Sequence, residues 1–211
     1  MTISIFDHEL PDETHNYYDV SFFSDHIRTL VTQTPSMVDA WLYEIYQIHR
    51  SHLNRLIIGL DVEWRPSFSS NSQNPIATLQ LCIGNRCLIF QLIHAPFIPV
   101  SLVGFLGDAG LTFVGVGIGG DAEKLLEDYG LQVANAVDLR FLAAEELGVR
   151  ELRNAGLKGL VMEVLGKEVQ KPRRITMSRW DNAWLTHAQV QYACLDAFLS
   201  FEIGRCLNAA H

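Results

Sequence analysis

The strongest constraint on the fold is the stretch from Ile57 to Trp64, which reads Ile-Ile-Gly-Leu-Asp-Val-Glu-Trp. An apolar run leads to two carboxylates two positions apart, Asp61 and Glu63. In a β-strand, residues at i and i+2 point to the same face, so both acids share one face at the end of a buried strand. This pattern is typical of a pair of metal ligands, but also of an ordinary acidic strand end. The choice depends on whether further carboxylates follow at usable positions.

Size and cysteine content bound the class of protein. A length of 211 residues and a hydrophobic fraction of 48% predict one folded domain with a substantial core. The four cysteines form no C-x-x-C pair, and the amino terminus is polar and acidic, unlike a signal peptide. We therefore expect reduced thiols and a cytoplasmic or nuclear location. Prolines and polar residues interrupt the uncharged stretch from Cys87 to Gly107, which favours a buried strand and helix over a membrane span.

The net charge of −8 is unevenly distributed. Residues 150–179 hold eight basic residues against three acidic ones, so this segment carries +5 and the remainder of the chain −13. A basic segment on an acidic molecule indicates either a surface that contacts phosphates or a solvated helical face with a basic loop. Within the segment, Lys171, Arg173 and Arg174 are the candidate contacts to a nucleic-acid backbone.

The hydrophobic pattern predicts an α/β fold with an amino-terminal extension. Short strands and an amphipathic helix that opens at Pro35 make up the extension, residues 1–50. From residue 51 to 211 we expect a mixed sheet of about five strands flanked by helices. Its first three strands are joined by short links and should be antiparallel. The expected strands are 57–64, 76–82, 87–90, 112–116 and one within 132–139, and the expected later helices are 141–147, 157–165 and about 187–207.

A glycine-rich turn at residues 115–120 has the form of a dinucleotide-binding fingerprint, with Asp138 18 residues beyond Gly120. Two observations oppose that interpretation. The motif should open the first βαβ unit of its domain, whereas here it follows three strands joined as a meander. Asp121 also places a carboxylate at the helix amino terminus, where a pyrophosphate would bind. We therefore expect no dinucleotide cofactor, and Asp121 suits a cation better than a phosphate.

The last predicted helix carries a tyrosine and an acid on one face. Thr186 and Gln189 form a capping-box pattern, so the helix should begin near His187. Tyr192 and Asp196 are four residues apart and therefore share a face, beside an apolar stripe that can pack on the sheet. Taken alone, the two are either a buried hydrogen-bonded pair or part of a site.

The ordered set Asp61, Glu63, Asp121 and Asp196, with Tyr192 in the last motif, resembles the DEDD superfamily of 3′-5′ exonucleases on the ribonuclease H-like fold. The tyrosine places the resemblance in the DEDDy subclass, because the related subclass has His where this chain has Gln191. It is closest to Werner-syndrome-type exonuclease domains and to the short plant proteins called RISC-interacting clearing exoribonucleases. It covers about residues 52–207. The segments that carry it are 61–64, 77–82, 115–121, 137–139 and 185–197.

The resemblance implies a two-metal mechanism. Hydrolysis of a phosphodiester by water uses two divalent cations roughly 3.5 to 4 Å apart, and Mg²⁺ or Mn²⁺ prefers oxygen ligands. By the resemblance, Asp61 bridges both ions, Glu63 and Asp196 complete the first site, and Asp121 holds the second partly through water. Tyr192 orients the attacking water, because its ordinary pKa of about 10 favours orientation over proton abstraction. The product is a nucleoside 5′-monophosphate from the 3′ end.

The substrate follows only from the resemblance. No motif distinguishes RNA from DNA, since contacts to 2′-hydroxyls make that choice. The likeness to the plant proteins implies single-stranded RNA, with Argonaute silencing complexes as partners in small-RNA clearance. A Werner-type DNA exonuclease and a non-catalytic nucleic-acid-binding module are the alternatives, and the intact set of acids argues against the second. Trp64 either stacks on the terminal base or is a core residue.

Charge also suggests assembly. The first 50 residues carry a net charge of −6, opposite in sign to the basic segment. Such segments can pair between subunits, and a contact repeated under rotation closes a ring. We therefore expect a homo-oligomer in which a neighbour's residues line the path into each active site. The alternative is that the extension only covers its own sheet.

Overall fold

The computed structural model describes residues 3–11, 14–67 and 73–210. Its strands are β1 (Ile3–Asp7), β2 (His15–Phe22), β3 (Asp25–Thr32), β4 (Ile57–Trp64), β5 (Ile76–Ile83), β6 (Arg86–Phe90), β7 (Thr112–Gly115) and β8 (Ala136–Asp138). Its α-helices are α1 (Pro35–His49), α2 (Val100–Leu106), α3 (Ile118–Tyr129), α4 (Leu139–Glu146), α5 (Leu157–Leu165), α6 (Arg173–Thr176) and α7 (His187–Cys206). Short 3-10 turns lie at Leu53–Arg55, Leu92–His94 and Arg150–Asn154.

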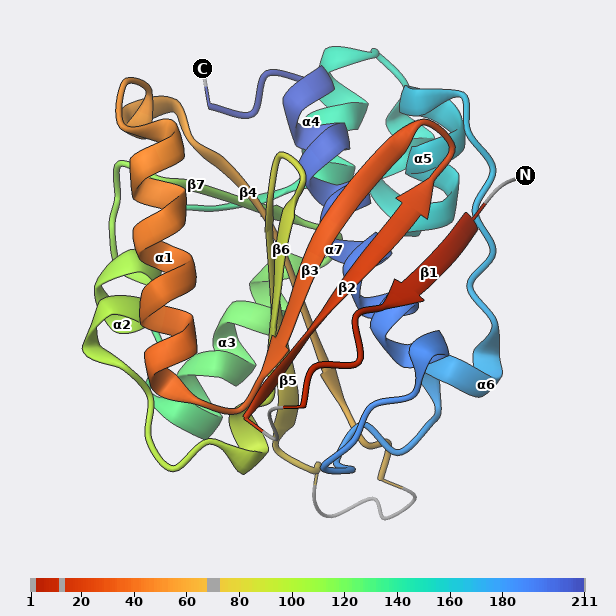
Figure 1. Ribbon diagram of the computed structural model, residues 1–211. Helices are drawn as coiled ribbons and strands as arrows, with labels where there is room; N and C mark the ends of the chain where they lie inside the picture. The colour runs from red at the N-terminus through yellow and green to blue at the C-terminus, as the bar shows by residue number, and fades with distance from the viewer. Residues whose placement is uncertain (1–2, 12–13, 68–72, 211) are drawn as a thin grey trace.

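The described strands form one mixed sheet in the order β1-β2-β3-β6-β5-β4-β7-β8 (Figure 1). The predicted antiparallel meander of β4, β5 and β6 is confirmed. β7 and β8 add in parallel on the β4 side, and β3 runs parallel to β6. The carboxyl ends of β3, β6, β4, β7 and β8 therefore lie along one edge of the sheet, called here the carboxyl edge.

The amino-terminal strands extend this sheet. β1 and β2 pair with each other, and β2 pairs with β3, in antiparallel ladders. The five strands expected after residue 50 correspond to β4–β8, and the extension adds three more. Because β3 pairs directly with β6, the extension shares its backbone hydrogen bonds with the strands that follow. The boundary at residue 50 stays a prediction, and residues 68–72, between β4 and β5, lie outside the described residues.

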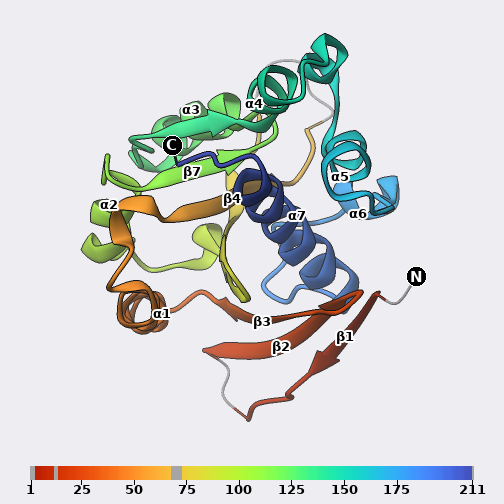
Figure 2. The same cartoon turned by 90° about the horizontal axis from the view of Figure 1, so that it is seen from above.

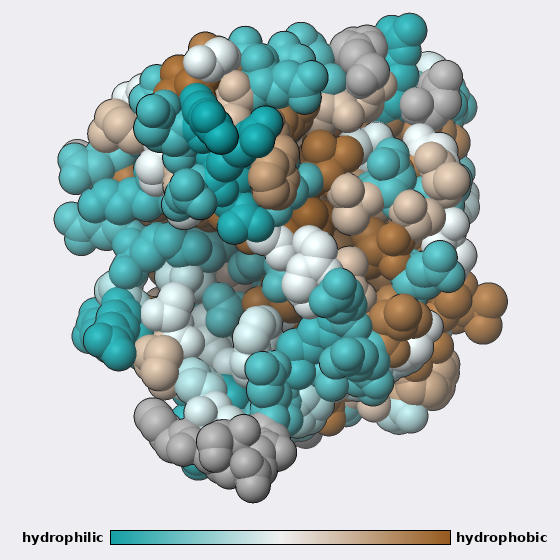
Figure 3. All heavy atoms as spheres, turned by 180° about the vertical axis from the view of Figure 1, so that it is seen from behind, coloured by the Kyte–Doolittle hydropathy of each residue, from teal (hydrophilic) through white to brown (hydrophobic). Residues whose placement is uncertain are grey.

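Helices cover both faces of the sheet (Figure 2). α4, α5 and α7 pack on one face with one buried cluster, and α1, α2 and α3 pack on the other with a second. Phe97, shortly before α2 in the sequence, is 64% exposed, and Val100, the first residue of α2, is 85% exposed. Hydrophobic side chains gather on this side of the molecule (Figure 3). Among the described helices, none combines the length and apolar character needed to cross a membrane.

Glycine lets α7 lie directly on β4. A Cβ at Gly59 would clash with the carbonyl oxygen of Ala197 and lie 2.7 Å from the amide nitrogen of Phe201. A Cβ at Gly204 would lie 2.9 Å from Cγ2 of Val114 in β7. Gly59 precedes Asp61 by two positions, so both are on the face that meets α7. The close backbone contact therefore brings the end of β4 next to the middle of α7.

The amino end of α7 is capped as the sequence predicts. The Thr186 side chain accepts a hydrogen bond from the Gln189 amide, and the Gln189 side chain accepts one from the Thr186 amide. This reciprocal pair satisfies two helix-end donors. It fixes where α7 begins, and hence which of its residues face the sheet.

Candidate active site

Three carboxylates meet where α7 crosses β4. Asp61 and Glu63 on β4 and Asp196 on α7 each place an oxygen within 4.8 Å of the others. The pleat of β4 directs its two acids to the same side, as the sequence predicts. Asp196 is only 4% exposed, because α7 packs against the sheet at this point. The structure thus unites the strand pair with the acid from the last helix.

Asp121 lies near the same three acids, on the helix that follows β7, the parallel neighbour of β4. The chain leaves β7 through Gly117, whose φ of +78° allows the sharp turn into α3, and Asp121 lies in the first turn of that helix. It lines a cavity of about 410 Å³ together with Asp61, Glu63 and Trp64. It is not part of the tight group of three. The glycine-rich turn therefore presents an acid to the cavity.

Burial and mutual repulsion raise the pKa values of these acids. Burial, with the charges of Asp61 and Asp196 beside it, raises the pKa of Glu63 to about 10. Burial and the charge of Asp138 raise the pKa of Asp121 to about 7. The pKa of Asp61 lies well above its usual range for the same two kinds of reason. Burial also raises the pKa of Asp196, although Lys171 opposes the rise. The group therefore attracts protons or cations.

One carboxylate oxygen of Asp61 lacks a hydrogen-bond partner among the described residues. Its Oδ2 is buried and accepts no hydrogen bond from the described residues. A buried carboxylate oxygen without a partner carries the full cost of losing water. A divalent cation would supply that partner, and a set made only of carboxylate oxygens suits Mg²⁺ or Mn²⁺. The residues present therefore fit a metal site.

Tyr192 is held against this group. It is buried one helical turn before Asp196, and the two side chains share a face of α7. The Trp180 ring packs against it, with ring centroids 6.0 Å apart. Burial and the charge of Asp196 raise the pKa of Tyr192 far above its ordinary value. The phenol is therefore neutral and fixed in direction.

The three basic candidates separate in space. The Lys171 ammonium lies 2.5 Å from Oδ2 of Asp196, so the structure pairs this lysine with a candidate metal ligand. Arg173 and Arg174 open α6 and are exposed, and Arg174 lines a cavity of about 400 Å³ beside Tyr192. Sequence reasoning treated the three as equivalent because charge density does not reveal which side chain turns inward.

Trp64 lies at the rim of the cavity and also packs on the core. It is partly buried against the cluster beneath α1, α2 and α3. A register irregularity between Glu63 and Trp64 turns the end of β4, and the Lys124 ammonium lies 5.5 Å from the centroid of the Trp64 ring. Thr176 and Met177 also line the cavity, and no sequence signal marked them.

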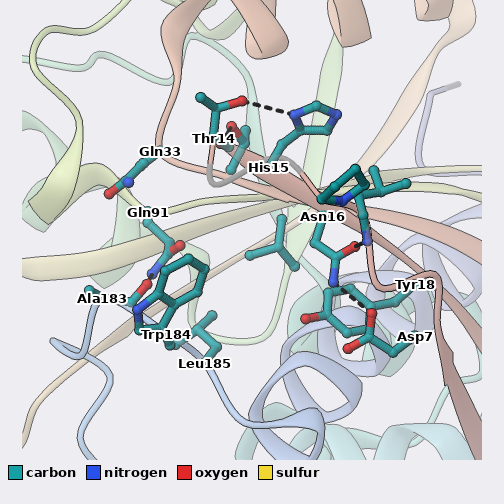
Figure 4. Close-up of a pocket in the computed structure, with 14 residues that line it drawn as sticks. Asp7, Thr14, His15, Asn16, Tyr18, Gln33, Gln91, Ala183, Trp184 and Leu185 are labelled. Atoms are coloured by element: carbon teal, nitrogen blue, oxygen red, sulfur yellow. Dashed lines mark hydrogen bonds between the residues drawn. The ribbon is translucent and has the colours of Figure 1, made fainter.

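A second cavity, of about 290 Å³, lies between the extension and the segment before α7 (Figure 4). Asn16 donates a 2.6 Å hydrogen bond to Asp7 on one side of it, and Trp184, 71% exposed, lies on the other. The Gln91 amide ties the segment before α7 to the sheet by donating to the carbonyl oxygens of Asn182 and Ala183. Its lining mixes aromatic, apolar and polar side chains and gathers no set of acids like that at β4.

Comparison with known proteins agrees with this geometry. The model of the 3′-5′ exonuclease family matches residues 32–209. The chain belongs to this family. It is 35% identical over 186 residues to a 3′-5′ exonuclease of Arabidopsis thaliana. This match covers 86% of this chain and 64% of that protein. It is also 35% identical over 153 residues to the mouse bifunctional 3′-5′ exonuclease/ATP-dependent helicase WRN, over 72% of this chain and 11% of that protein. The predicted resemblance is confirmed, although the chain spans less than two thirds of either relative.

Solved structures of the family agree on the fold. The Nibbler exonuclease domain of Aedes aegypti matches with a TM-score of 0.67 at 20% identity, over 85% of this chain and 87% of that one. A crystal of the EXD2 exonuclease domain soaked in Mn matches with a TM-score of 0.50 at 28% identity, over 86% and 90%. The fold is the ribonuclease H-like fold of DEDD exonucleases, as predicted.

Proposed function

We propose that this chain is a metal-dependent 3′-5′ exonuclease that hydrolyses single-stranded nucleic acid, RNA foremost, to nucleoside 5′-monophosphates. The observation that carries the proposal is the group of Asp61, Glu63 and Asp196, with one partnerless oxygen on Asp61, in a member of this family. A module that only bound nucleic acid would gain nothing from holding three repelling acids this close together.

The proposed cofactor is Mg²⁺ or Mn²⁺, two ions per site. Asp61 would touch both ions, Glu63 and Asp196 would complete the first site, and Asp121 would hold the second from across the cavity. Bound there, the ions would supply Lewis acidity that activates water and stabilises the leaving oxygen. The Mn-soaked crystal of the EXD2 domain, from the same family, supports this choice.

The remaining roles belong to side chains around the acids. Tyr192, neutral and packed against Trp180, would orient the attacking water without taking its proton. Trp64 at the cavity rim would stack on the terminal base. Arg173 and Arg174, exposed on α6, would contact phosphates of the strand.

RNA is the proposed substrate because of the likeness to the short plant exoribonucleases, and the proposed setting is clearance of small-RNA fragments with Argonaute complexes in the cytoplasm. DNA is the second candidate, and the match to mouse WRN favours it. We further propose a homo-oligomer, which the opposite charges of the extension and the basic segment support. Light scattering over a concentration series tests this assembly, and a fully active monomer would contradict it.

The deciding experiment is digestion of matched single-stranded RNA and DNA labelled at the 5′ end. We expect a ladder shortening from the 3′ end in Mg²⁺, faster on RNA, and no shortening in EDTA. Asp61→Asn is the matched inactive control. Faster digestion of DNA would replace RNA with DNA in the proposal, and cleavage that persists in EDTA would contradict the metal site.

A further inference from the structure

A positive charge already lies among the candidate metal ligands. The Lys171 ammonium is 2.5 Å from Oδ2 of Asp196 and 5.1 Å from the centroid of the Tyr192 ring. The Asp196 side chain is only 6% exposed, whereas the Lys171 side chain is 30% exposed. The lysine therefore reaches from a solvent-facing segment down to a buried acid.

This ion pair differs from the others formed by lysines of the chain. Lys167 pairs with Asp25 at 3.1 Å, and both side chains are about one third exposed. Lys124 pairs with Asp128 one turn along the same helix. Neither of those acids belongs to the group of three that could hold a metal. Lys171 alone of these lysines neutralises an oxygen that a divalent ion would need.

The chemistry of lysine suits temporary occupation. Its ammonium is a compact charge on a flexible stem with three donors, so it can leave one acceptor for another without a change of backbone. A divalent ion brings twice the charge to the same acids and outcompetes one ammonium, but the ammonium still has to be displaced. A ligand that must first displace a competitor binds with a lower apparent affinity.

We propose that Lys171 competes with the metal for Asp196 and, once displaced, moves to the phosphate backbone of the bound strand. This inference rests on the proposed function, because it assigns a role within the same site. The segment that carries Lys171 continues directly into α6, where Arg173 and Arg174 are exposed. A displaced ammonium therefore lies on the same short segment as these two guanidinium groups, and that segment continues to Thr176 and Met177, which line the cavity with Asp61 and Glu63.

The proposal predicts effects of opposite sign. Lys171→Met keeps the length of the stem and removes the charge, so Mn²⁺ should bind on the order of tenfold more tightly, a coupling of ordinary size for two ligands on one protein. The same substitution should weaken binding of a single strand severalfold, because one phosphate contact is lost. A purely structural ion pair would not make metal binding tighter.

The test measures metal and strand binding without turnover. Free Mn²⁺ is titrated by electron paramagnetic resonance into the wild type, Lys171→Met, Lys171→Arg and Lys167→Met, with circular dichroism to check the fold of each. A fluorescent single-stranded RNA is then titrated in Ca²⁺ and followed by anisotropy. Lys167→Met removes the same charge from a pair outside the site, and Lys171→Arg keeps the charge in place. Both controls should bind Mn²⁺ within about twofold of the wild type, since neither removes the competitor.

The outcomes distinguish failure of the proposed metal site from failure of the proposed role of Lys171. A wild type that binds no Mn²⁺ overturns the metal site of the proposed function. A wild type that binds Mn²⁺, with Lys171→Met equal or weaker, overturns only the role of Lys171. Equal tightening by Lys171→Met and Lys167→Met reduces the effect to net charge and overturns it as well. Tighter Mn²⁺ and weaker strand binding in Lys171→Met alone support it.

Discussion

Two acids toward the carboxyl edge, one on each of the strands that flank β7, have opposite surroundings. Asp138, at the end of β8, accepts hydrogen bonds from the backbone amide of Arg140 at 3.0 Å and from its guanidinium at 2.6 Å. Burial alone would raise the pKa of Asp138, but these bonds hold it below its usual value. Asp61, at the end of β4, keeps a buried oxygen without a partner and a pKa well above the usual range.

The contrast separates a structural acid from a functional one. The chain supplies the partner of Asp138 two residues later, where the acid also caps α4. At β4 and α7 the chain brings three acids together, and of these only Asp196 forms an ion pair, with Lys171. Such a group destabilises the folded state, so its presence indicates a role in binding a ligand.

The largest effect should come from removing one acid from each environment. Asp61→Asn should lower the rate of strand cleavage by at least about a thousandfold, because metal assistance contributes several kcal/mol to the transition state. Its free energy of unfolding without metal should stay level or rise, since a repelling charge is lost. Asp138→Asn should keep the metal ligands but lose about 1 to 2 kcal/mol of stability with the helix cap and ion pair.

Cleavage assays and urea unfolding of both variants check this pair. Loss of stability in Asp61→Asn, or loss of cleavage in Asp138→Asn with the fold intact, would mean that the two acids are not of different kinds.

The second effect should come from forcing α7 off β4. Gly59→Ala places a Cβ against backbone atoms of Ala197 and Phe201, which cannot rotate away. We expect a loss of about 2 to 4 kcal/mol in the free energy of unfolding, as for overpacked cores. Divalent ions should stabilise this variant less than the wild type, because Asp196 moves away from Asp61.

Thermal unfolding with and without Mg²⁺ measures both quantities, and Gly119→Ala in α3, where a Cβ meets nothing within 4 Å, is the matched control. Equal stability of the two variants would show that α7 does not need the glycine.

The third effect is the pH dependence of stability without metal. The pKa of Glu63 is about 10 in the fold against an ordinary value of 4.5, so the folded state keeps a proton that the unfolded state releases. Stability should therefore fall as pH rises from about 5 to 8, by a fraction of the limiting slope of about 1.4 kcal/mol per unit, since Glu63 is only partly buried.

Glu63→Gln should flatten that slope, and Mg²⁺ should reduce it by holding the charged form. The pKa of Asp138 is lowered, so its contribution is present above about 4 and is lost only in stronger acid. Asp138→Asn removes one charge that raises the pKa of Asp121 to about 7, so it should flatten the slope between pH 5 and 8 less than Glu63→Gln does. Urea unfolding at several pH values tests this, and a flat wild-type profile would contradict it.

Much of this arrangement could be predicted from local pattern. The strand periodicity of residues 57–64 placed Asp61 and Glu63 on one face, and the capping box fixed the start of α7 and so the direction of Tyr192 and Asp196. Both signals depend on neighbours within four residues. The antiparallel pairing of β5 with β6 followed likewise from the short link at Gly84 and Asn85.

What escaped prediction depends on contacts between distant segments. Lys171 and Asp196 are 25 residues apart, and nothing near Lys171 indicates that its side chain turns inward. The parallel pairing of β3 with β6 joins strands separated in the sequence by α1, β4 and β5. The need for glycine at position 59 appears only when α7 is laid on β4. Such contacts are set by packing, which a single sequence does not display.

The smallest effect concerns charges outside the cavity. Arg173 and Arg174 are exposed and belong to none of the ion pairs described here, unlike Lys171. If they contact phosphates, changing both to Gln should weaken single-strand binding severalfold and reduce the slope of log affinity against log salt by roughly 1 to 2, since about 0.7 counterion is released per contact on a single strand. Mn²⁺ binding should not change, because neither arginine reaches the acids. Anisotropy titrations at several salt concentrations measure the slope, with Arg150→Gln and Arg153→Gln together as a control of equal charge elsewhere in the basic segment. Equal slopes for the two double variants would assign the effect to net charge, and an unchanged slope in the first would make α6 a solvated helix that the strand does not touch.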